Sequence, residues 1–222
     1  EHQLKQWDVW GRKYTTLGLL AWYDLSGDKK ALKAASRVID HLMTQVGPGL
    51  RNITSTGNYH GMASSSILEP VIYLYQRTGE ARYLDFAKYI AEEMNAADGP
   101  LLIDKALAGV PVSTRFPHPK VWFSVENGQK AYEMMSCYEG LLELYKLTGE
   151  ETYLKAVEAT VKTIIEQEIN IAGSGSAFEC WYGGAERQTM ATYHTMETCV
   201  TFTWMQLCNR LLHITRDVAL WN

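Results

Sequence analysis

Two side chains that could bind a metal ion stand two positions apart near the end of the chain, Glu197 and Cys199. They enter a segment with helical periodicity, so a carboxylate and a thiolate can point toward one ion from a helix start. Zinc takes S and O ligands, usually in a tetrahedral set, so the remaining ligands would come from elsewhere. The same spacing also fits a first-turn acid beside a buried thiol, and spacing alone favours that interpretation.

A further carboxylate, Glu179, lies in the glycine- and serine-rich segment 173–184, among small and aromatic residues. Such surroundings raise the pKa of a carboxyl group through desolvation, and a raised pKa suits the general acid of glycoside cleavage. A solvated loop carboxylate or an acid at a helix N-terminus is the alternative. Trp181 and Tyr182 offer rings on which sugars stack, and with His194 they are candidate substrate-binding residues.

His60 follows a short Gly-Asn-Tyr run and stands at the start of a predicted helix. A histidine held by small residues could hydrogen-bond a sugar hydroxyl, so His60 is another candidate substrate-binding residue, although a lone histidine is more often structural. His118 and Trp122 are weaker candidates. The serines at 64–66 have no partner base and no nucleophile-elbow pattern, which argues against a serine hydrolase.

The elements that position these residues follow from a repeated pattern, a glycine followed by an acid at Gly27-Asp28, Gly79-Glu80 and Gly149-Glu150. A Tyr lies four residues before each glycine and a Leu five residues after it. The apolar spacing predicts a helix on each side of the turn. The glycine ends the first helix in a left-handed cap, and the acid meets the positive end of the second helix. A degenerate fourth copy covers 211–217.

The periodicity predicts helices over residues 8–25, 29–46, 61–77, 80–95, 130–147, 150–169 and 196–214. Two long irregular segments, 96–129 and 170–195, separate them, and loops of that length are usually functional. Repeated hairpins stack and bury their inner faces, so the predicted fold is all-α, of the α/α-toroid kind. Because these helices are too few for six hairpins, we expect a partial (α/α)6 barrel, a single incomplete domain over 1–222.

The composition is that of an ordinary globular chain, with 46% hydrophobic and 21% charged residues. A net charge of -4 argues against a nucleic-acid partner, and the apolar runs are too short for a membrane span. Seven Trp and thirteen Tyr against five Phe suit a wet sugar-binding cleft as well as a core. The four cysteines form no CxxC pair and leave the compartment, cytoplasm or periplasm, open.

Two longer motifs carry a family resemblance. Met196-Glu197-Thr198-Cys199-Val200, followed by Asn209-Arg210-Leu211-Leu212, is similar to an E-T-C-A…R-L-L signature. Ile67-Leu68-Glu69-Pro70, followed by Tyr75-Gln76-Arg77-Thr78-Gly79, is similar to an H-L-I-E-P…Y-x-x-T-G hairpin. Through these motifs the chain resembles the β-L-arabinofuranosidase group, glycoside hydrolase family 127 and its relatives. The resemblance extends over nearly the whole chain.

The resemblance implies a bacterial-type (α/α)6 catalytic barrel followed by β-sandwich domains. It also implies a retaining mechanism, with L-arabinofuranosides or related plant-polysaccharide glycans as substrates. It also implies a zinc ion held by one Glu and three Cys, with one Cys as nucleophile and another Glu as general acid/base. Carried over by motif, Glu197 and Cys199 would be zinc ligands and Glu179 the acid/base. Glu186 is the alternative acid/base, because the residues around Glu179 differ from the family's G-E-x-F pattern.

The sequence departs from the family at two points. Ser66 stands where many relatives have His. In the family the other two zinc cysteines form an adjacent pair downstream of E-T-C, whereas here only Cys208 follows Cys199. We therefore expect a half-site with weak or no zinc affinity, a chain that is inactive alone, and a missing C-terminal segment with β-sandwich domains.

Two other functions keep the toroid fold. A metal-free enzyme of the epimerase or unsaturated glucuronyl hydrolase type would gather His60, His118 and His194 in its pocket. A helical-repeat carbohydrate-binding module would present a groove lined by Trp and Tyr, with no perturbed carboxylate. A metal-dependent thiol enzyme requires the two carboxylates and the thiol at 179, 197 and 199 to converge.

Overall fold

The computed structural model describes residues 4, 6–118, 120–121, 124–181 and 196–221. The chain forms two compact units, Glu1–Pro100 and Leu101–Asn222, and each consists of helical hairpins. Across the described ranges the regular structure is helical, with isolated β-bridges and no strand. The all-α prediction is therefore confirmed. In the same ranges, no helix is both long enough and apolar enough to cross a membrane.

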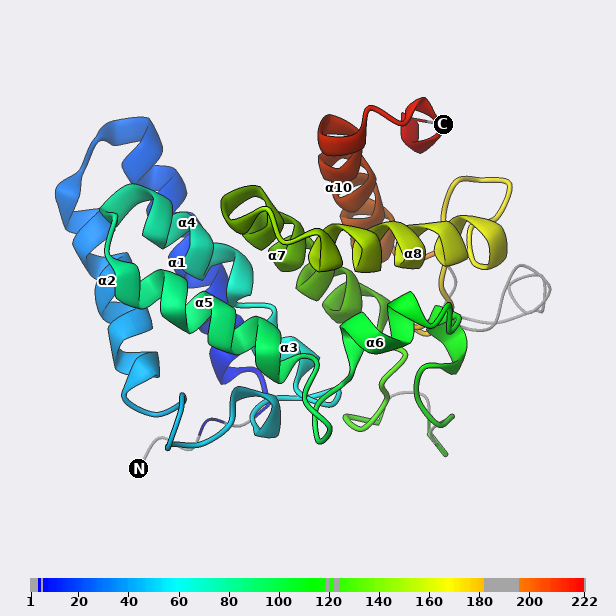
Figure 1. Cartoon of the computed structure of the whole chain (residues 1–222), viewed down its shortest axis with the longest axis horizontal. Coiled ribbons are helices and arrows are strands. Elements are labelled where there is room, and N and C mark those ends of the chain that lie inside the picture. The colour runs from blue at the N-terminus through cyan, green and yellow to red at the C-terminus, as the bar shows by residue number, and fades with distance from the viewer. Residues whose placement is uncertain (1–3, 5, 119, 122–123, 182–195, 222) are drawn as a thin grey trace. The chain divides into compact units, whose positions relative to one another are not determined.

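The first unit contains two hairpins and a short connecting region. Its elements are α1 (Asp8–Ser26), α2 (Lys29–Met43), η1 (Ile53–Ser55), α3 (Met62–Ser65), α4 (Leu68–Thr78) and α5 (Ala81–Glu93). Helix α1 packs against α2, and α4 packs against α5 (Figure 1). The short helix α3 contacts α1 and η1, and so anchors the loop that carries His60.

The second unit is organised around one almost fully buried helix. Its elements are α6 (Leu102–Leu107), η2 (Val112–Thr114), α7 (Ala131–Thr148), α8 (Glu151–Gln167), α10 (Thr198–Thr215) and η3 (Val218–Trp221). Helix α7 is the buried one, and it packs against α8 on one side and α10 on another (Figure 1). Helix α6 packs against α8. The start of α7 and the start of α10 are the two places that matter for the candidate site.

The three hairpin turns have the geometry that the repeat predicts. Gly27, Gly79 and Gly149 have φ values of 70°, 69° and 70°, and each donates its N–H to the carbonyl of the Tyr four residues earlier at 2.8 Å. The acid that follows each glycine is the N-cap of the next helix. In the degenerate fourth copy, Arg216 takes the left-handed position after α10, with φ 63°.

Two parts of the helix prediction need correction. The helix expected over 61–77 is two helices, because Pro70 has no N–H to donate to Ser66 and its ring crowds that carbonyl, so the chain breaks between α3 and α4. The segment 96–129, expected to be irregular, contains α6 and the 3-10 turn η2. Its prolines and glycines hide a single short helix from a search for periodicity.

The segment before α7 is tied to the core of the second unit. Arg115 is buried and donates to the Tyr138 hydroxyl on α7. Gln129 donates its side-chain N–H to the carbonyl of Phe116. A Cβ added at Gly128 would lie 2.0 Å from the Phe116 ring, so glycine alone fits there. These contacts fix the main chain that leads into α7.

Candidate active site

The carboxylate of Glu197 stands at the N-terminus of α10 and is bound by the preceding loop. Glu197 is the N-cap of the helix. The Ser176 hydroxyl donates to its Oε2, and the Glu179 N–H donates to its Oε1 at 3.0 Å. A negative charge at a helix N-terminus is also stabilised by the helix dipole. Glu197 therefore joins the loop to the helix through both of its oxygens.

Glu179 lies in a loop whose backbone is unusual for residues with side chains. Ser176, Phe178 and Glu179 have φ values of 75°, 54° and 60°, and Met196, just before Glu197, has φ 56°. Such left-handed conformations cost roughly 1–3 kcal/mol each and persist where surrounding contacts enforce them. Residues 176–179 are called the acid loop below. The hydrogen bond to Glu197 is one of the contacts that enforce its conformation.

The acid loop is also paired with the start of α7. The Ala131 N–H donates to the Glu179 carbonyl at 3.0 Å, and the Trp181 N–H donates to the Gln129 carbonyl at 2.9 Å. The Lys130 ammonium forms an ion pair with Oε2 of Glu179. The Lys130 side chain is 4% exposed, whereas that of Glu179 is 52% exposed. A buried cation thus holds a carboxylate whose other side is open.

Cys199 lies in the first turn of α10, close to these acids. Partial burial raises the pKa of its thiol, and the negative charge of Glu179 is the next cause. The charges of Glu197 and Glu133 act in the same direction. The thiol is therefore protonated near neutral pH in this arrangement, and a bound cation would have the opposite effect because it stabilises the thiolate.

Cys180 is the second thiol beside the acid loop, and its environment is different. It is fully buried, and its sulfur contacts Asn127 Nδ2 at 2.9 Å and the Phe178 carbonyl at 3.0 Å. Burial raises the pKa of this thiol to about 12. Cys180 is therefore an inert packing residue at neutral pH.

The predicted zinc ligands, Glu197 and Cys199, fit zinc by donor type only. Glu197 and Cys199 offer an oxygen and a sulfur donor from the same helix start, and each carboxylate oxygen keeps a second lone pair beside its hydrogen bond. Over the ranges that the structure describes, no group of three or more His, Cys, Asp and Glu side chains is arranged to hold a metal ion. The pair alone does not make a tetrahedral site.

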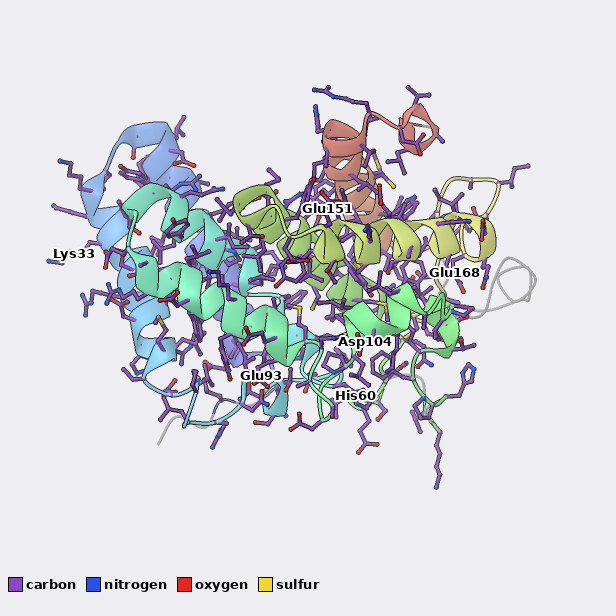
Figure 2. All side chains as sticks on the ribbon, in the orientation of Figure 1. Lys33, His60, Glu93, Asp104, Glu151 and Glu168 are labelled. Atoms are coloured by element: carbon purple, nitrogen blue, oxygen red, sulfur yellow. The ribbon has the colours of Figure 1, made fainter. Side chains whose placement is uncertain are left out.

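The other predicted substrate-binding residues have varied locations. His60 lies in the first unit, exposed on the loop before α3 and with φ 53° (Figure 2). Trp181 is fully buried, with its ring 3.3 Å from where a Cβ on Gly175 would lie, so the ring packs inside the second unit. Tyr182 and His194 lie outside the described residues, as does Glu186.

Sequence reasoning missed three residues of this site, Lys130, Glu133 and Ser176. Glu133 is buried in the first turn of α7, and its charge raises the pKa of both nearby thiols. Lys130 and Glu133 come from a segment far from the acid loop in sequence, and nothing in their spacing points there. Ser176 stands inside the Gly/Ser-rich stretch, which marked the loop but not this hydroxyl.

Three solved structures resemble this chain in fold. A GH127 β-L-arabinofuranosidase from Geobacillus stearothermophilus T6 has a TM-score of 0.68 at 14% identity, and the matched region covers 96% of this chain and 34% of that enzyme's chain. A GH127 β-arabinofuranosidase has a TM-score of 0.66 at 18% identity, with 96% and 31% covered. A further glycoside hydrolase has a TM-score of 0.67 at 16% identity, with 96% and 36% covered. The chain thus spans about a third of the length of these structures.

At that identity the structural likeness shows the fold, and it confirms the α/α-toroid class predicted from the hairpins. The chain belongs to the family described as β-L-arabinofuranosidase, GH127 catalytic domain, whose model matches residues 2–222. Compared by sequence with curated proteins, the chain has no match.

Proposed function

We propose that the complete protein carrying this chain is a retaining glycoside hydrolase that acts on L-arabinofuranosides or related plant glycans. The family of the chain supports this substrate class, as do the two relatives that are named as arabinofuranosidases. The observation that carries the proposal is the hydrogen bond from the Glu179 N–H to the Glu197 carboxylate, at 3.0 Å, with Cys199 close enough for both charges to act on its pKa.

In this proposal Glu179 is the general acid/base. Its side chain is half exposed, so a substrate oxygen can approach it. As a carboxylic acid it donates its proton to the glycosidic oxygen while the bond to the anomeric carbon breaks. As a carboxylate it then takes a proton from the water that completes hydrolysis. The thiolate nucleophile would come from a part of the protein beyond these 222 residues.

We further propose that Glu197 and Cys199 contribute two ligands to a zinc ion of the complete protein. Zinc, when bound, keeps thiol ligands in the thiolate form. Glu197 would then have two roles, since its oxygens also bind the acid loop. The acid–base step assigned to Glu179 uses this chain's own carboxyl group and does not depend on the metal.

The first experiment compares Glu179→Gln with Glu166→Gln in the complete protein, using an alkyl β-L-arabinofuranoside. Glu166 is an exposed acid on α8, so its variant controls for loss of charge. We expect E179Q to lower kcat by about 10²–10⁴-fold and E166Q to leave it unchanged. Equal rates for the two variants would rule out Glu179 as the acid.

The zinc proposal has a separate readout. Metal content of the purified complete protein, measured by mass spectrometry, should fall in Glu197→Gln and Cys199→Ser and stay at the wild-type level in E166Q. Unchanged zinc in both site variants would remove these residues from the ligand set. The anomer formed first, followed by NMR, tests retention.

A further inference from the structure

Lys130 is held in place by the main chain on both sides. It is the N-cap of α7, with φ -54° and ψ 115°, and it forms an antiparallel bridge with Cys180. Its neighbours Gln129 and Ala131 exchange main-chain hydrogen bonds with Trp181 and Glu179. The position of its side chain is therefore set by the same contacts that set the acid loop.

The ion pair between Lys130 and Glu179 is asymmetric in burial. The lysine side chain is 4% exposed and the glutamate side chain 52% exposed. An ion pair between two exposed residues contributes little, because water screens it and both side chains are free to move. Here the lysine approaches from the protein interior and contacts one oxygen, Oε2. Removing the lysine would remove the ion pair that holds Oε2 of Glu179.

Other carboxylates lie near this cation. Glu133, Glu179 and Glu197 all act on the pKa of Cys199, so three carboxylates share this region. Without a positive charge among them, mutual repulsion would favour rotation of the most exposed carboxylate, that of Glu179, toward solvent. The strained backbone at Glu179 would then hold a side chain with no fixed direction.

We propose that Lys130 is the positioning residue for Glu179: its buried ammonium donates to Oε2 and so directs the other oxygen, which carries the proton to be transferred, toward the glycosidic oxygen. This inference rests on the proposed role of Glu179. The lysine itself transfers no proton to substrate; the proton moves from Glu179 to the leaving oxygen as its bond to the anomeric carbon breaks. An acid that points away slows this transfer while substrate still binds.

The test uses three variants of the complete protein and two substrates. Lys130→Met keeps the aliphatic stem and removes the charge, and Lys130→Arg restores the charge. Lys146→Met is the matched control, because Lys146 lies on the same helix and pairs with Glu143 at 2.8 Å, away from the acid loop. The substrates are an alkyl β-L-arabinofuranoside, whose leaving group needs protonation, and the 4-nitrophenyl analogue, whose leaving group does not.

We expect K130M to lower kcat/KM on the alkyl substrate by about 30-fold and on the nitrophenyl substrate by no more than about 3-fold, because kcat/KM reports cleavage of the glycosidic bond and not the later hydrolysis step that both substrates share. K130R should recover part of the loss, and K146M should behave as wild type. If the role of Lys130 were purely structural, K130M would lower kcat/KM on both substrates equally. That result, or wild-type kcat/KM in K130M on the alkyl substrate, would overturn the inference, provided that circular dichroism and thermal unfolding show a folded variant.

The two proposals fail in different ways. If E179Q keeps its activity, Glu179 is not the acid and the role of Lys130 falls with it. If E179Q is impaired and more so on the alkyl substrate, while K130M is unaffected on both, the acid assignment stands and only the positioning role is wrong.

Discussion

The hairpin turns and the acid loop solve the same backbone problem with different residues. Each turn places one residue in the left-handed region, and there the residue is glycine, with nothing within 4 Å of where a Cβ would lie. The acid loop places Ser176, Phe178 and Glu179 in that region, although each carries a side chain. The turns need only a conformation, whereas the loop needs the conformation and the side chains together.

The difference shows where this protein accepts strain. A glycine in a turn avoids the cost of the left-handed conformation. In the acid loop the cost is offset by bonds that use the side chains themselves, since Ser176 donates to Glu197 and Glu179 pairs with Lys130. A hydrogen bond to a charged group contributes about 1.5–3 kcal/mol, which is of the size of the strain. The strained backbone and the candidate site residues therefore lie in the same loop of the second unit.

The largest expected effect comes from removing the group that holds the acid loop. Glu197→Ala removes the acceptor of both loop hydrogen bonds and the proposed zinc ligand. We expect the activity of the complete protein to fall by at least about 10⁴-fold, because several functions are lost at once. Hydrogen exchange should also become faster at the Glu179 amide. Unchanged exchange there would contradict the role of Glu197 in holding the loop.

The next effect separates strain from chemistry at one position. Glu179→Gly and Glu179→Ala both remove the partner of the buried Lys130 ammonium, and only Glu179→Gly also relieves the left-handed strain. We expect the free energy of unfolding of Glu179→Gly to exceed that of Glu179→Ala by up to about 1 kcal/mol, while activity falls by about 10²–10⁴-fold in both. Urea unfolding and initial rates measure the two. Equal free energies of unfolding in the two variants would show that the left-handed conformation at Glu179 carries no strain.

Glycines of the first unit and of the turns sharpen the comparison. A Cβ at Gly61, where φ is 78°, would lie 2.3 Å from the Thr54 carbonyl oxygen, so Gly61→Ala should destabilise the protein by about 3 kcal/mol or more. Gly149→Ala meets no neighbour and should cost about 1 kcal/mol through its conformation alone. Thermal unfolding of both variants provides the measurement, and equal shifts in Tm would contradict the steric argument.

The smallest effect concerns the buried thiol that follows the acid loop. Burial raises the pKa of Cys180 from 9.0 to about 12, so the folded state holds this proton more tightly than the unfolded state. The resulting stability is complete below the unfolded pKa and is lost as pH rises from 9 toward 12, by about 1.4 kcal/mol for each pH unit. Urea unfolding at pH 8 and pH 10 should therefore show a shallower loss in Cys180→Ala. Equal slopes would contradict the expected shift.

Much of the fold could be predicted because its signals are local. The glycine, the Tyr before it and the acid after it fix each hairpin within a few residues, and the structure confirms all three turns. The short helix α6 and the break at Pro70 were missed, because one depends on packing against α8 and the other on a single missing N–H. The expectation of one incomplete domain over 1–222 stays a prediction.

The candidate site could be predicted only in part. The family motif pointed to Glu179, Glu197 and Cys199, and these residues are close together. Lys130 could not be found, because its contact joins residues 130 and 179 and depends on how two loops pair. Trp181 was predicted to contact substrate through its ring, which is buried in the second unit, and this role stays a prediction. The roles assigned to His60, Tyr182 and His194 stay predictions.

The hydrogen bond between the Glu179 amide and Glu197 has one more consequence. An amide proton that points at a carboxylate is deshielded, so its NMR resonance lies downfield and moves when the carboxylate changes partner. Glu179, the proposed acid/base, therefore carries in its own main chain an NMR signal that reports on Glu197. A titration with zinc, read at this one resonance, would report on Glu197 without any substrate or added probe.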